Sequence, residues 1–334
     1  MTLAHPQDEN PAQAAPQDGR KQVRIGTRGS PLALVQTRAF MQQIGDFCTA
    51  AGNHALAFEE FQIRTTGDRV QDVRLAEIGG KGLFAKEIHE AMLDGRIDLA
   101  VHSLKDLETA LPDGIILGAT LTREDCRDAL ILGPEAGPPD PGDPFACLPE
   151  GGTIGTSSVR RQSQLLHRRP DLKIALLRGN VQTRLERTER GDFGASLLAL
   201  AGLRRLGLQQ RASLALEPEA MLPAACQGIV GVTVRAADTD LVQLLSDLED
   251  KVSRVVATAE RSMLAFLDGS CRTPIGGHAR LLQDGRLHLT GLVAREDGSF
   301  LLKRGVSGAP ADADRMGREL GTELRRDSPE ALFA

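Results

Sequence analysis

One stretch of the chain, residues 153–190, carries a charge opposite to that of the whole protein. It holds eight Arg and one Lys against three acidic residues, a net charge of +6, in a chain of 334 residues whose formal net charge is −5. Positive charge gathered within an acidic protein favours a specific anionic ligand. A solvated basic surface without a ligand is the simpler alternative.

The start of this stretch has the pattern of a helix N-terminus that binds an anion. Gly155 permits a tight turn, and Ser157 or Ser158 can cap the helix that follows. Arg160 and Arg161 then fall in the first helical turn, where the helix dipole disfavours cations. Backbone N–H groups, hydroxyls and two guanidinium groups at one helix end together predict an anion site.

The pattern recurs directly afterwards. Residues 173–177 indicate a buried strand, Arg178 lies at its carboxyl end, and residues 179–180 cap a helix that presents Arg184. Ligands of open α/β sheets bind beyond the carboxyl ends of strands, so both arginines join the predicted site.

A fainter form of the pattern begins near the N-terminus. Residues 23–25 indicate a strand, Arg28 lies in the turn after it, and Ser30 caps a helix that begins with proline. Two similar strand–turn–helix units predict an α/β fold with two similar lobes and a cleft between them. The strands and helix expected after residue 247 predict a small C-terminal α+β domain.

The arginines near strand ends or helix starts point to one kind of ligand. A guanidinium fork matches a carboxylate or phosphate, and six forks suggest a ligand with several anionic groups. Asp106 lies beside Lys105 at the end of another strand, where it could hold a substrate cation, transfer a proton, or merely cap a turn. The six arginines are Arg28, Arg160, Arg161, Arg178, Arg184 and Arg205.

Composition excludes several other classes of protein. The chain has no Trp and no Tyr and is acidic, which argues against nucleic-acid binding. No apolar run approaches the length of a membrane span, and residues 1–20 lack a secretory signal and resemble a disordered tail. Five cysteines without metal-type spacing predict no metal site and a reducing cytoplasm.

Among the thiols, Cys271 is the candidate for chemistry. Gly and Ser precede it and Thr and Pro follow soon after, so it lies in a loop where a thiol is accessible. A buried, inert thiol is the alternative.

The motifs together resemble the porphobilinogen deaminase (hydroxymethylbilane synthase) family, from about residue 23 to the last helix. Eight motifs carry the resemblance. They are RIGTRGSPLAL (24–34), GGKGLF (79–84), VHSLKD (101–106), GTSSVRRQ (155–162), LRGN (177–180), TRL (183–185), AGLRRLG (201–207) and GSCRTPIG (269–276).

The resemblance implies a role for each matching residue. A dipyrromethane cofactor would be attached to Cys271 by a thioether, and Asp106 would contact pyrrole N–H groups and stabilise positive charge as ammonia leaves. Lys81 and Phe84 fall in the family's active-site lid region, and Gln227 in the segment that joins the lobes, as substrate contacts. The groups that would hold acetate and propionate side chains are Arg28, Ser30, Lys105, Ser158, Arg160, Arg161, Arg178, Arg184 and Arg205.

The implied activity is that of a transferase of tetrapyrrole and heme biosynthesis. Four porphobilinogen molecules would be condensed head to tail onto the bound dipyrromethane, with loss of ammonia, and hydrolysis would release hydroxymethylbilane. The bound chain would carry about a dozen carboxylates, which accounts for a basic cleft in an acidic protein. The family also implies a cytoplasmic monomer.

The resemblance also implies a domain plan. Residues 1–21 would be a tail, 22–121 with 229–246 the first lobe, 122–228 the second lobe with the basic cleft face, and 247–334 the domain of the cofactor cysteine. The lobes would be like those of periplasmic binding proteins.

Three positions depart from the family pattern. Leu107 and Glu108 follow Asp106 where a hydrophobic residue and Pro are usual, Cys126 replaces a usual Pro, and Cys226 a usual Gly. The two cysteines add thiols near functional loops.

Two other classes remain as alternatives. A solute receptor also has two α/β lobes and an anion-binding cleft, although the C-terminal domain with Cys271 does not belong to that class. A phosphate- or nucleic-acid-binding protein is disfavoured because the chain lacks a Walker-type loop and has no Trp or Tyr for stacking.

Overall fold

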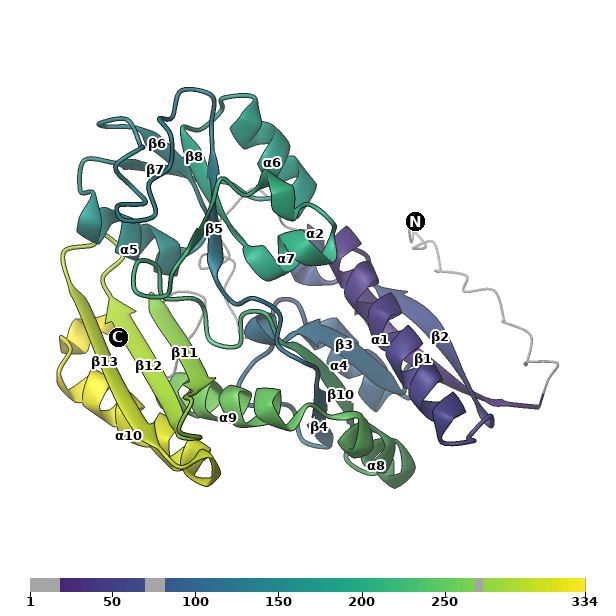
Figure 1. Cartoon of the computed structure of the whole chain (residues 1–334). Helices are drawn as coiled ribbons and strands as arrows, with labels where there is room; N and C mark the ends of the chain where they lie inside the picture. Colours follow the sequence, from purple (N-terminus) through teal and green to yellow (C-terminus); the bar gives the residue numbers. More distant parts are fainter. Residues whose placement is uncertain (1–18, 70–81, 268–272, 334) are drawn as a thin grey trace, which may run out of the picture.

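The computed structural model of the protein describes residues 19–69, 82–267 and 273–333. Over these residues the chain forms two five-stranded sheets and one three-stranded sheet, each packed against helices (Figure 1). This arrangement confirms the predicted fold class of two α/β lobes and a smaller C-terminal unit.

The first sheet, which together with its helices we call lobe 1, contains one strand from far along the chain. Its order is β2-β1-β3-β10-β4, and β10 runs antiparallel to both neighbours, with Val232 opposite Val101 and Ala119. The chain therefore returns to this sheet at Val230–Arg235. The strands are β1 (Lys21–Arg28), β2 (Leu56–Ile63), β3 (Leu99–Ser103), β4 (Ile115–Thr120) and β10 (Val230–Arg235).

The helices of lobe 1 start from local sequence signals. Ser30 caps α1 by accepting a hydrogen bond from the Ala33 N–H at 3.4 Å, and Pro31 occupies the first turn. Phe40 and Ile44 of α1 are fully buried in the core of the sheet. The helices are α1 (Pro31–Ala50), α2 (Thr66–Arg69), α4 (Lys86–Leu93), the 3₁₀ turn η1 (Leu104–Asp106) and α8 (Thr239–Leu248).

The second sheet, the centre of lobe 2, has the order β7-β6-β8-β5-β9. The prediction of a buried strand at 173–177 is wrong in part. The strand is only three residues long and lies at the sheet edge, where Lys173 is exposed and Ile174 half-buried. The strands are β5 (Asp128–Leu132), β6 (Thr153–Gly155), β7 (Lys173–Ala175), β8 (Ala195–Ala199) and β9 (Leu214–Leu216).

The helices of lobe 2 begin at the predicted caps. Ser158 accepts a hydrogen bond from the Arg161 N–H at 3.4 Å, and Asn180 accepts one from the Thr183 N–H at 2.9 Å. Residues 133–152 connect β5 to β6, and two of their side chains, Phe145 and Leu148, are buried in the lobe 2 core. The helices are α5 (Val159–Arg168), α6 (Val181–Glu189), α7 (Leu200–Arg205) and the 3₁₀ turn η2 (Gln209–Arg211).

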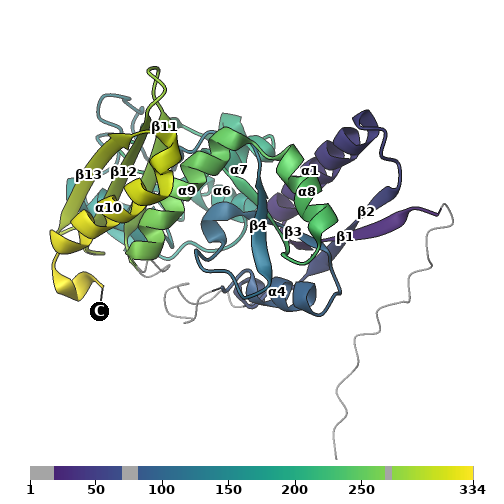
Figure 2. The same cartoon turned by 90° about the horizontal axis from the view of Figure 1, so that it is seen from below.

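The C-terminal unit is an antiparallel sheet, in the order β11-β12-β13, covered by two helices. Figure 2 shows α9 extending from this unit along lobe 1, beside β4. The two helices pack closely, because Gly317 lies directly against the backbone of Ala259. The elements are α9 (Lys251–Phe266), β11 (Ile275–Leu281), β12 (Leu287–Ala294), β13 (Leu301–Gly308), α10 (Ala313–Arg326) and the 3₁₀ turns η3 (Pro310–Asp312) and η4 (Glu330–Leu332).

Candidate active site

A small hollow lies where β1 and β3 end. It has a volume of about 70 Å³. Its position at the carboxyl ends of two parallel strands is where α/β folds bind ligands. The polar and aromatic residues that line it include Arg28, Ser30, Gln36, Phe84, His102, Ser103 and Asp106.

Arg28 is held in place on two sides at this hollow. Its Nε donates to Oδ1 of Asp68 at 3.1 Å, and its guanidinium carbon lies 4.1 Å from the centre of the Phe84 ring. Burial alone would raise the pKa of Asp68, but the hydrogen bond and charge of Arg28 lower it below its ordinary value. Asp68 is a partner that the sequence did not reveal, because only the fold brings α2 beside β1.

Asp106 and Lys105 lie together in the turn after β3. Asp106 is exposed at the hollow, and Lys105 Nζ donates to Oε1 of Gln227 at 3.2 Å. Burial lowers the pKa of Lys105 to about 8, although the negative charge of Asp106 opposes the shift. This ammonium can therefore lose its charge close to neutral pH.

Arg160 and Arg161 share one buried acid, Asp128. Arg160 Nη2 lies 2.9 Å from Oδ2 and Arg161 Nη2 lies 2.7 Å from Oδ1 of a carboxylate with no exposed surface. Burial alone would raise the pKa of Asp128, but the two guanidinium charges hold it far below the ordinary value. The two arginines in the first turn of α5, which the sequence predicted to bind a ligand, therefore also form ion pairs with an acid of the protein itself.

Gln227 joins this acid to lobe 1. Its Nε2 donates to Oδ1 of Asp128 at 2.9 Å and to the carbonyl oxygen of Cys126 at 2.8 Å, while its Oε1 accepts from Lys105. Gln227 is fully buried. A continuous polar chain thus runs from Lys105 through Gln227 and Asp128 to the two arginines of α5.

Arg178 and Arg184 bring lobe 2 charge to the same place. Arg178 Nη2 lies 3.5 Å from the carbonyl oxygen of Gly67 in lobe 1. Burial lowers the pKa of Arg178, and the charge of Arg28 lowers it further. Burial also lowers the pKa of Arg184 to about 10, with Arg178 contributing and Asp106 opposing. Charges from both lobes are therefore close enough to influence one another.

The two serines and Arg205 have structural partners. The Ser30 and Ser158 oxygens accept N–H groups as helix caps, which leaves each hydroxyl hydrogen able to donate to an anion. Arg205 Nη2 donates to the carbonyl oxygen of Gly228 at 2.6 Å, in the segment between the lobes. Two predicted site residues, Lys81 and Cys271, lie outside the described residues.

Other arginines of the charged stretch form ion pairs away from the hollow. Arg169 pairs with Asp171 at 2.8 Å, and Arg187 and Arg190 both pair with Asp192. The net charge of residues 153–190 is therefore only partly directed at a ligand.

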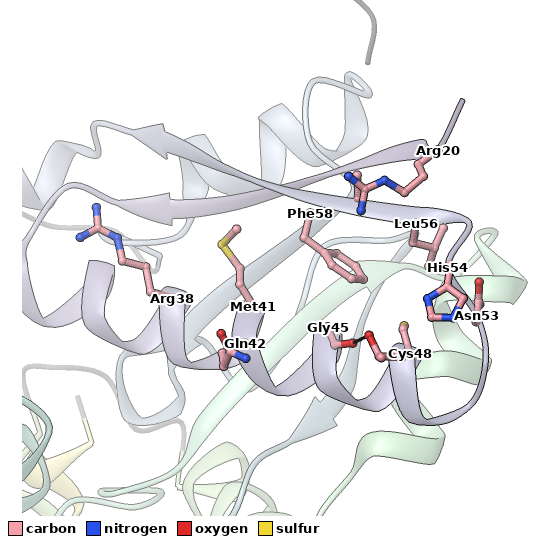
Figure 3. Close-up of a pocket in the computed structure, with 12 residues that line it drawn as sticks. Arg20, Arg38, Met41, Gln42, Gly45, Cys48, Asn53, His54, Leu56 and Phe58 are labelled. Carbon is pink, nitrogen blue, oxygen red and sulfur yellow. Dashed lines mark hydrogen bonds between the residues drawn. The ribbon is translucent and has the colours of Figure 1, made fainter. Parts of the chain in front are cut away.

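A second, larger hollow of about 480 Å³ lies between α1 and the edge strand β2 of lobe 1 (Figure 3). The residues that line it include Met41, Cys48, Phe58, Arg38 and His54. None of the predicted site residues within the described ranges lines it.

Two kinds of site are missing from the described residues. Over 19–69, 82–267 and 273–333, no three His, Cys, Asp or Glu side chains form a group that could hold a metal ion. No helix in these ranges is both long and apolar enough to cross a bilayer.

Two family models match most of the chain. Residues 23–243 match "Porphobilinogen deaminase, dipyromethane cofactor binding domain", and residues 255–326 match "Porphobilinogen deaminase, C-terminal domain".

This chain belongs to the porphobilinogen deaminase family.

Curated relatives are similar over nearly the whole chain. A porphobilinogen deaminase of Paracoccus denitrificans (strain Pd 1222) is 47% identical over 316 residues, which cover 95% of this chain and 97% of the relative. One of Syntrophobacter fumaroxidans (strain DSM 10017 / MPOB) is 46% identical, covering 90% and 94%. A chloroplastic one of Oryza sativa subsp. japonica is 44% identical, covering 93% and 85%.

Similarity to solved structures is weaker. The VFT2 domain of Bordetella pertussis BvgS, a double mutant, aligns with a TM-score of 0.41 at 14% identity, covering 73% of this chain and 93% of that domain. This similarity is too low to bear on function.

Arg28 at the hollow, together with two arginines of lobe 2, fits the cofactor of the porphobilinogen deaminase family. Dipyrromethane carries acidic side chains, and Arg28, Arg178 and Arg184 lie close enough to interact electrostatically in pairs. Such neighbouring cations repel one another unless anions lie between them. The donor set is therefore suited to a polycarboxylate.

Proposed function

We propose that this protein is a transferase that condenses four porphobilinogen molecules head to tail onto one covalently bound dipyrromethane per chain. Each condensation forms a carbon–carbon bond between the aminomethyl carbon of one porphobilinogen and a pyrrole α-carbon. It breaks the carbon–nitrogen bond of that aminomethyl group, so ammonia leaves, and the α-carbon loses a proton. Hydrolysis by water then releases hydroxymethylbilane.

One observation carries this proposal. Arg178 of lobe 2 lies 3.5 Å from the Gly67 carbonyl oxygen of lobe 1 and interacts electrostatically with Arg28, and Arg184 interacts with Arg178 and with the Asp106 carboxylate. A hollow with several cations close by, and with Asp106 as the one acid among the described residues that line it, suits a substrate with several carboxylates and one reacting cationic centre.

The proposed roles follow from the charges. Arg28, Arg178 and Arg184 bind acetate and propionate groups and thereby orient the rings. Arg160 and Arg161 also donate Nη1 to the carbonyl oxygens of Leu222 and Leu197, so their proposed part is to add positive charge beside the bound anions. The full set of proposed anion-binding residues adds Ser30, Lys105, Ser158 and Arg205, with Lys81, Phe84 and Gln227 as further substrate contacts.

Asp106 is the proposed catalytic residue. Its carboxylate stabilises the positive charge that develops on the reacting ring when ammonia leaves, and it would accept a hydrogen bond from a pyrrole N–H. Bound dipyrromethane would supply the pyrrole carbon onto which the first substrate is joined, with Cys271 as its proposed point of attachment.

A mass measurement tests the proposal most directly. The intact mass of the purified protein is expected to exceed the sequence mass by one dipyrromethane, and Ehrlich's reagent is expected to colour the protein. Cys271→Ala should remove both signals and turnover. A bare-chain mass together with full activity would contradict the covalent cofactor, and binding of porphobilinogen without turnover would favour the solute receptor.

Substitution of Asp106 tests the catalytic assignment. Asp106→Asn should lower kcat by roughly 10²- to 10⁴-fold, because the variant cannot offset positive charge, while its melting temperature stays near that of the wild type. Asp113→Asn is the matched control, since Asp113 is an exposed acid of the same connection. Equal turnover of the two variants would remove Asp106 from the mechanism.

Three coarser proposals accompany the activity. We divide the chain into a tail at 1–21, a first lobe at 22–121 with 229–246, a second lobe at 122–228 and a C-terminal domain at 247–334. We propose a monomer, which a sedimentation measurement checks. We propose a cytoplasmic location, supported by free thiols at the four described cysteines.

A further inference from the structure

An arginine of α9 holds the chain directly after Asp106. Arg261 Nη2 donates to the carbonyl oxygen of Glu108 at 2.6 Å and to that of Thr109 at 3.2 Å, and Nη1 donates to that of Leu107 at 3.3 Å. One guanidinium thus satisfies three consecutive main-chain acceptors of another unit of the fold. The planar fork of an arginine suits this, because it presents two separate nitrogens in a fixed plane, whereas a lysine presents its three N–H groups on a single nitrogen.

The contacts do not depend on the side chains of the loop. Arg261 binds carbonyl oxygens, so the departure from the family pattern at Glu108 leaves the interaction intact. Burial lowers the pKa of Arg261, while the charge of Glu108 opposes the shift. Arginine nevertheless stays charged at neutral pH.

Apolar packing supports the same connection. Leu104 and Leu107, on either side of Asp106, are 1% and 4% exposed and belong to one buried cluster with Ala257. Ala257 lies four residues before Arg261, so both occupy the same face of α9. The turn that carries Asp106 is therefore fixed to α9 in two ways. Apolar packing holds it before and after Asp106, and the hydrogen bonds of Arg261 hold the chain after Asp106.

Arg254 makes a comparable contact further from Asp106. It lies two helical turns before Arg261, and its Nη2 donates to the carbonyl oxygens of Leu117 at 3.0 Å and Gly118 at 3.3 Å. Both arginines thus join α9 to main-chain carbonyls of lobe 1. Only Arg261 does so next to the proposed catalytic carboxylate.

We propose that Arg261 is a positioning residue for the reaction: it fixes the Asp106 turn relative to α9. The C-cap of α9 is Leu267, four residues before Cys271 in the sequence. The contact therefore links the proposed catalytic carboxylate to α9, the helix that precedes the proposed cofactor cysteine in the sequence. This inference rests on the proposed function, because it assigns Asp106 and Cys271 to one reaction.

The test compares Arg261→Gln with Arg254→Gln. Each variant is checked for dipyrromethane by intact mass, and kcat is calculated per loaded chain. Arg261→Gln is expected to lower kcat on the order of 10- to 100-fold with KM within about twofold of the wild type, since a small misplacement of a catalytic group has this effect. Arg254→Gln is expected to keep kcat within about twofold.

Two further measurements separate positioning from a loss of stability. Amide hydrogen exchange over residues 104–110 should become faster in Arg261→Gln but not in Arg254→Gln. Arg261→Lys should recover kcat in part, because it keeps the charge and one of the three hydrogen bonds. A fall in kcat that follows the fall in melting temperature equally in both Gln variants would overturn the inference.

The failure of the proposed function gives a different result. A wild-type chain without dipyrromethane and without turnover would overturn the proposed function and with it the role of Arg261. A loaded, active wild type with an unaffected Arg261→Gln variant would overturn this inference alone.

Discussion

At the scale of single residues, the site depends on acids that orient its cations. Asp68 holds Arg28, and Asp128 holds Arg160 and Arg161. An unpaired arginine side chain has many rotamers, and each ordered one costs conformational entropy. Prior pairing with an acid orders the guanidinium before substrate arrives, so less entropy is lost on binding.

Asp128 provides the first prediction at this scale. Asp128→Asn should lower the free energy of unfolding by about 3–5 kcal/mol, because it leaves two buried guanidinium groups without their counter-charge. Urea denaturation followed by circular dichroism measures the change. Asp171→Asn, at the more exposed pair with Arg169, is the control and should shift the midpoint little. If the two variants had the same urea midpoint, Asp128 would not stabilise the protein by neutralising the two buried arginines.

Lys105 provides a prediction for the pH dependence of activity. Its pKa of about 8 means that the ammonium loses its charge as the pH rises from 7 to 9. If Lys105 binds a carboxylate, KM for porphobilinogen should rise over this range in the wild type. Lys105→Gln should show a higher KM than the wild type at pH 7 and no rise in KM between pH 7 and 9. The ratio of the variant's KM to the wild-type KM should therefore fall as the pH rises, and measuring this ratio against pH tests the assignment.

The same residue should have the opposite effect on folding. The ordinary pKa of lysine is 10.5, so between about pH 8 and 10.5 the unfolded chain binds more protons at this position than the folded chain. Its contribution to stability therefore rises with pH in this window. As the pH rises from about 8 to 10.5, the denaturation midpoint of the wild type should increase relative to that of Lys105→Gln. If the two midpoints changed with pH in the same way, Lys105 would not titrate in this range.

At the scale of elements, close helix packing in the C-terminal unit can be tested. A Cβ atom added to Gly317 of α10 would lie 2.4 Å from the carbonyl oxygen of Ala259 in α9. Gly317→Ala should therefore push the helices apart and lower the free energy of unfolding by about 1–3 kcal/mol. Gly45→Ala is the control, because Gly45 lies within α1 with nothing within 4 Å, and it should stabilise the protein by about 0.5–1 kcal/mol. If both variants changed the free energy of unfolding by the same amount, the packing explanation would be excluded.

Local sequence signals predicted elements well where the cause was local. The caps Ser30, Ser158 and Asn180 each bind an N–H within three residues, so their function depends on neighbours in the chain. The edge position of β7 depends on which strands pair, and an apolar run alone does not reveal it. Likewise, the partners Asp68 and Asp128 are distant in sequence from their arginines, so no local pattern indicates the pairs.

At the scale of the whole molecule, the sequence predicted two similar lobes. That prediction succeeded because the strand–turn–cap pattern occurs in both of them. The depth at which Arg160 and Arg161 are buried was not predictable. Their contact with Asp128 depends on how α5 lies over the second sheet, which only packing determines.

The central place of β10 has a consequence for synthesis on the ribosome. β4 is hydrogen-bonded to its sheet through β10 alone among the described strands, yet β4 ends at Thr120 and β10 begins at Val230. The nascent chain must therefore emerge through all of lobe 2 before lobe 1 can close. The lobe that is translated first is the one completed later, and its unfinished edge is exposed to chaperones in the meantime.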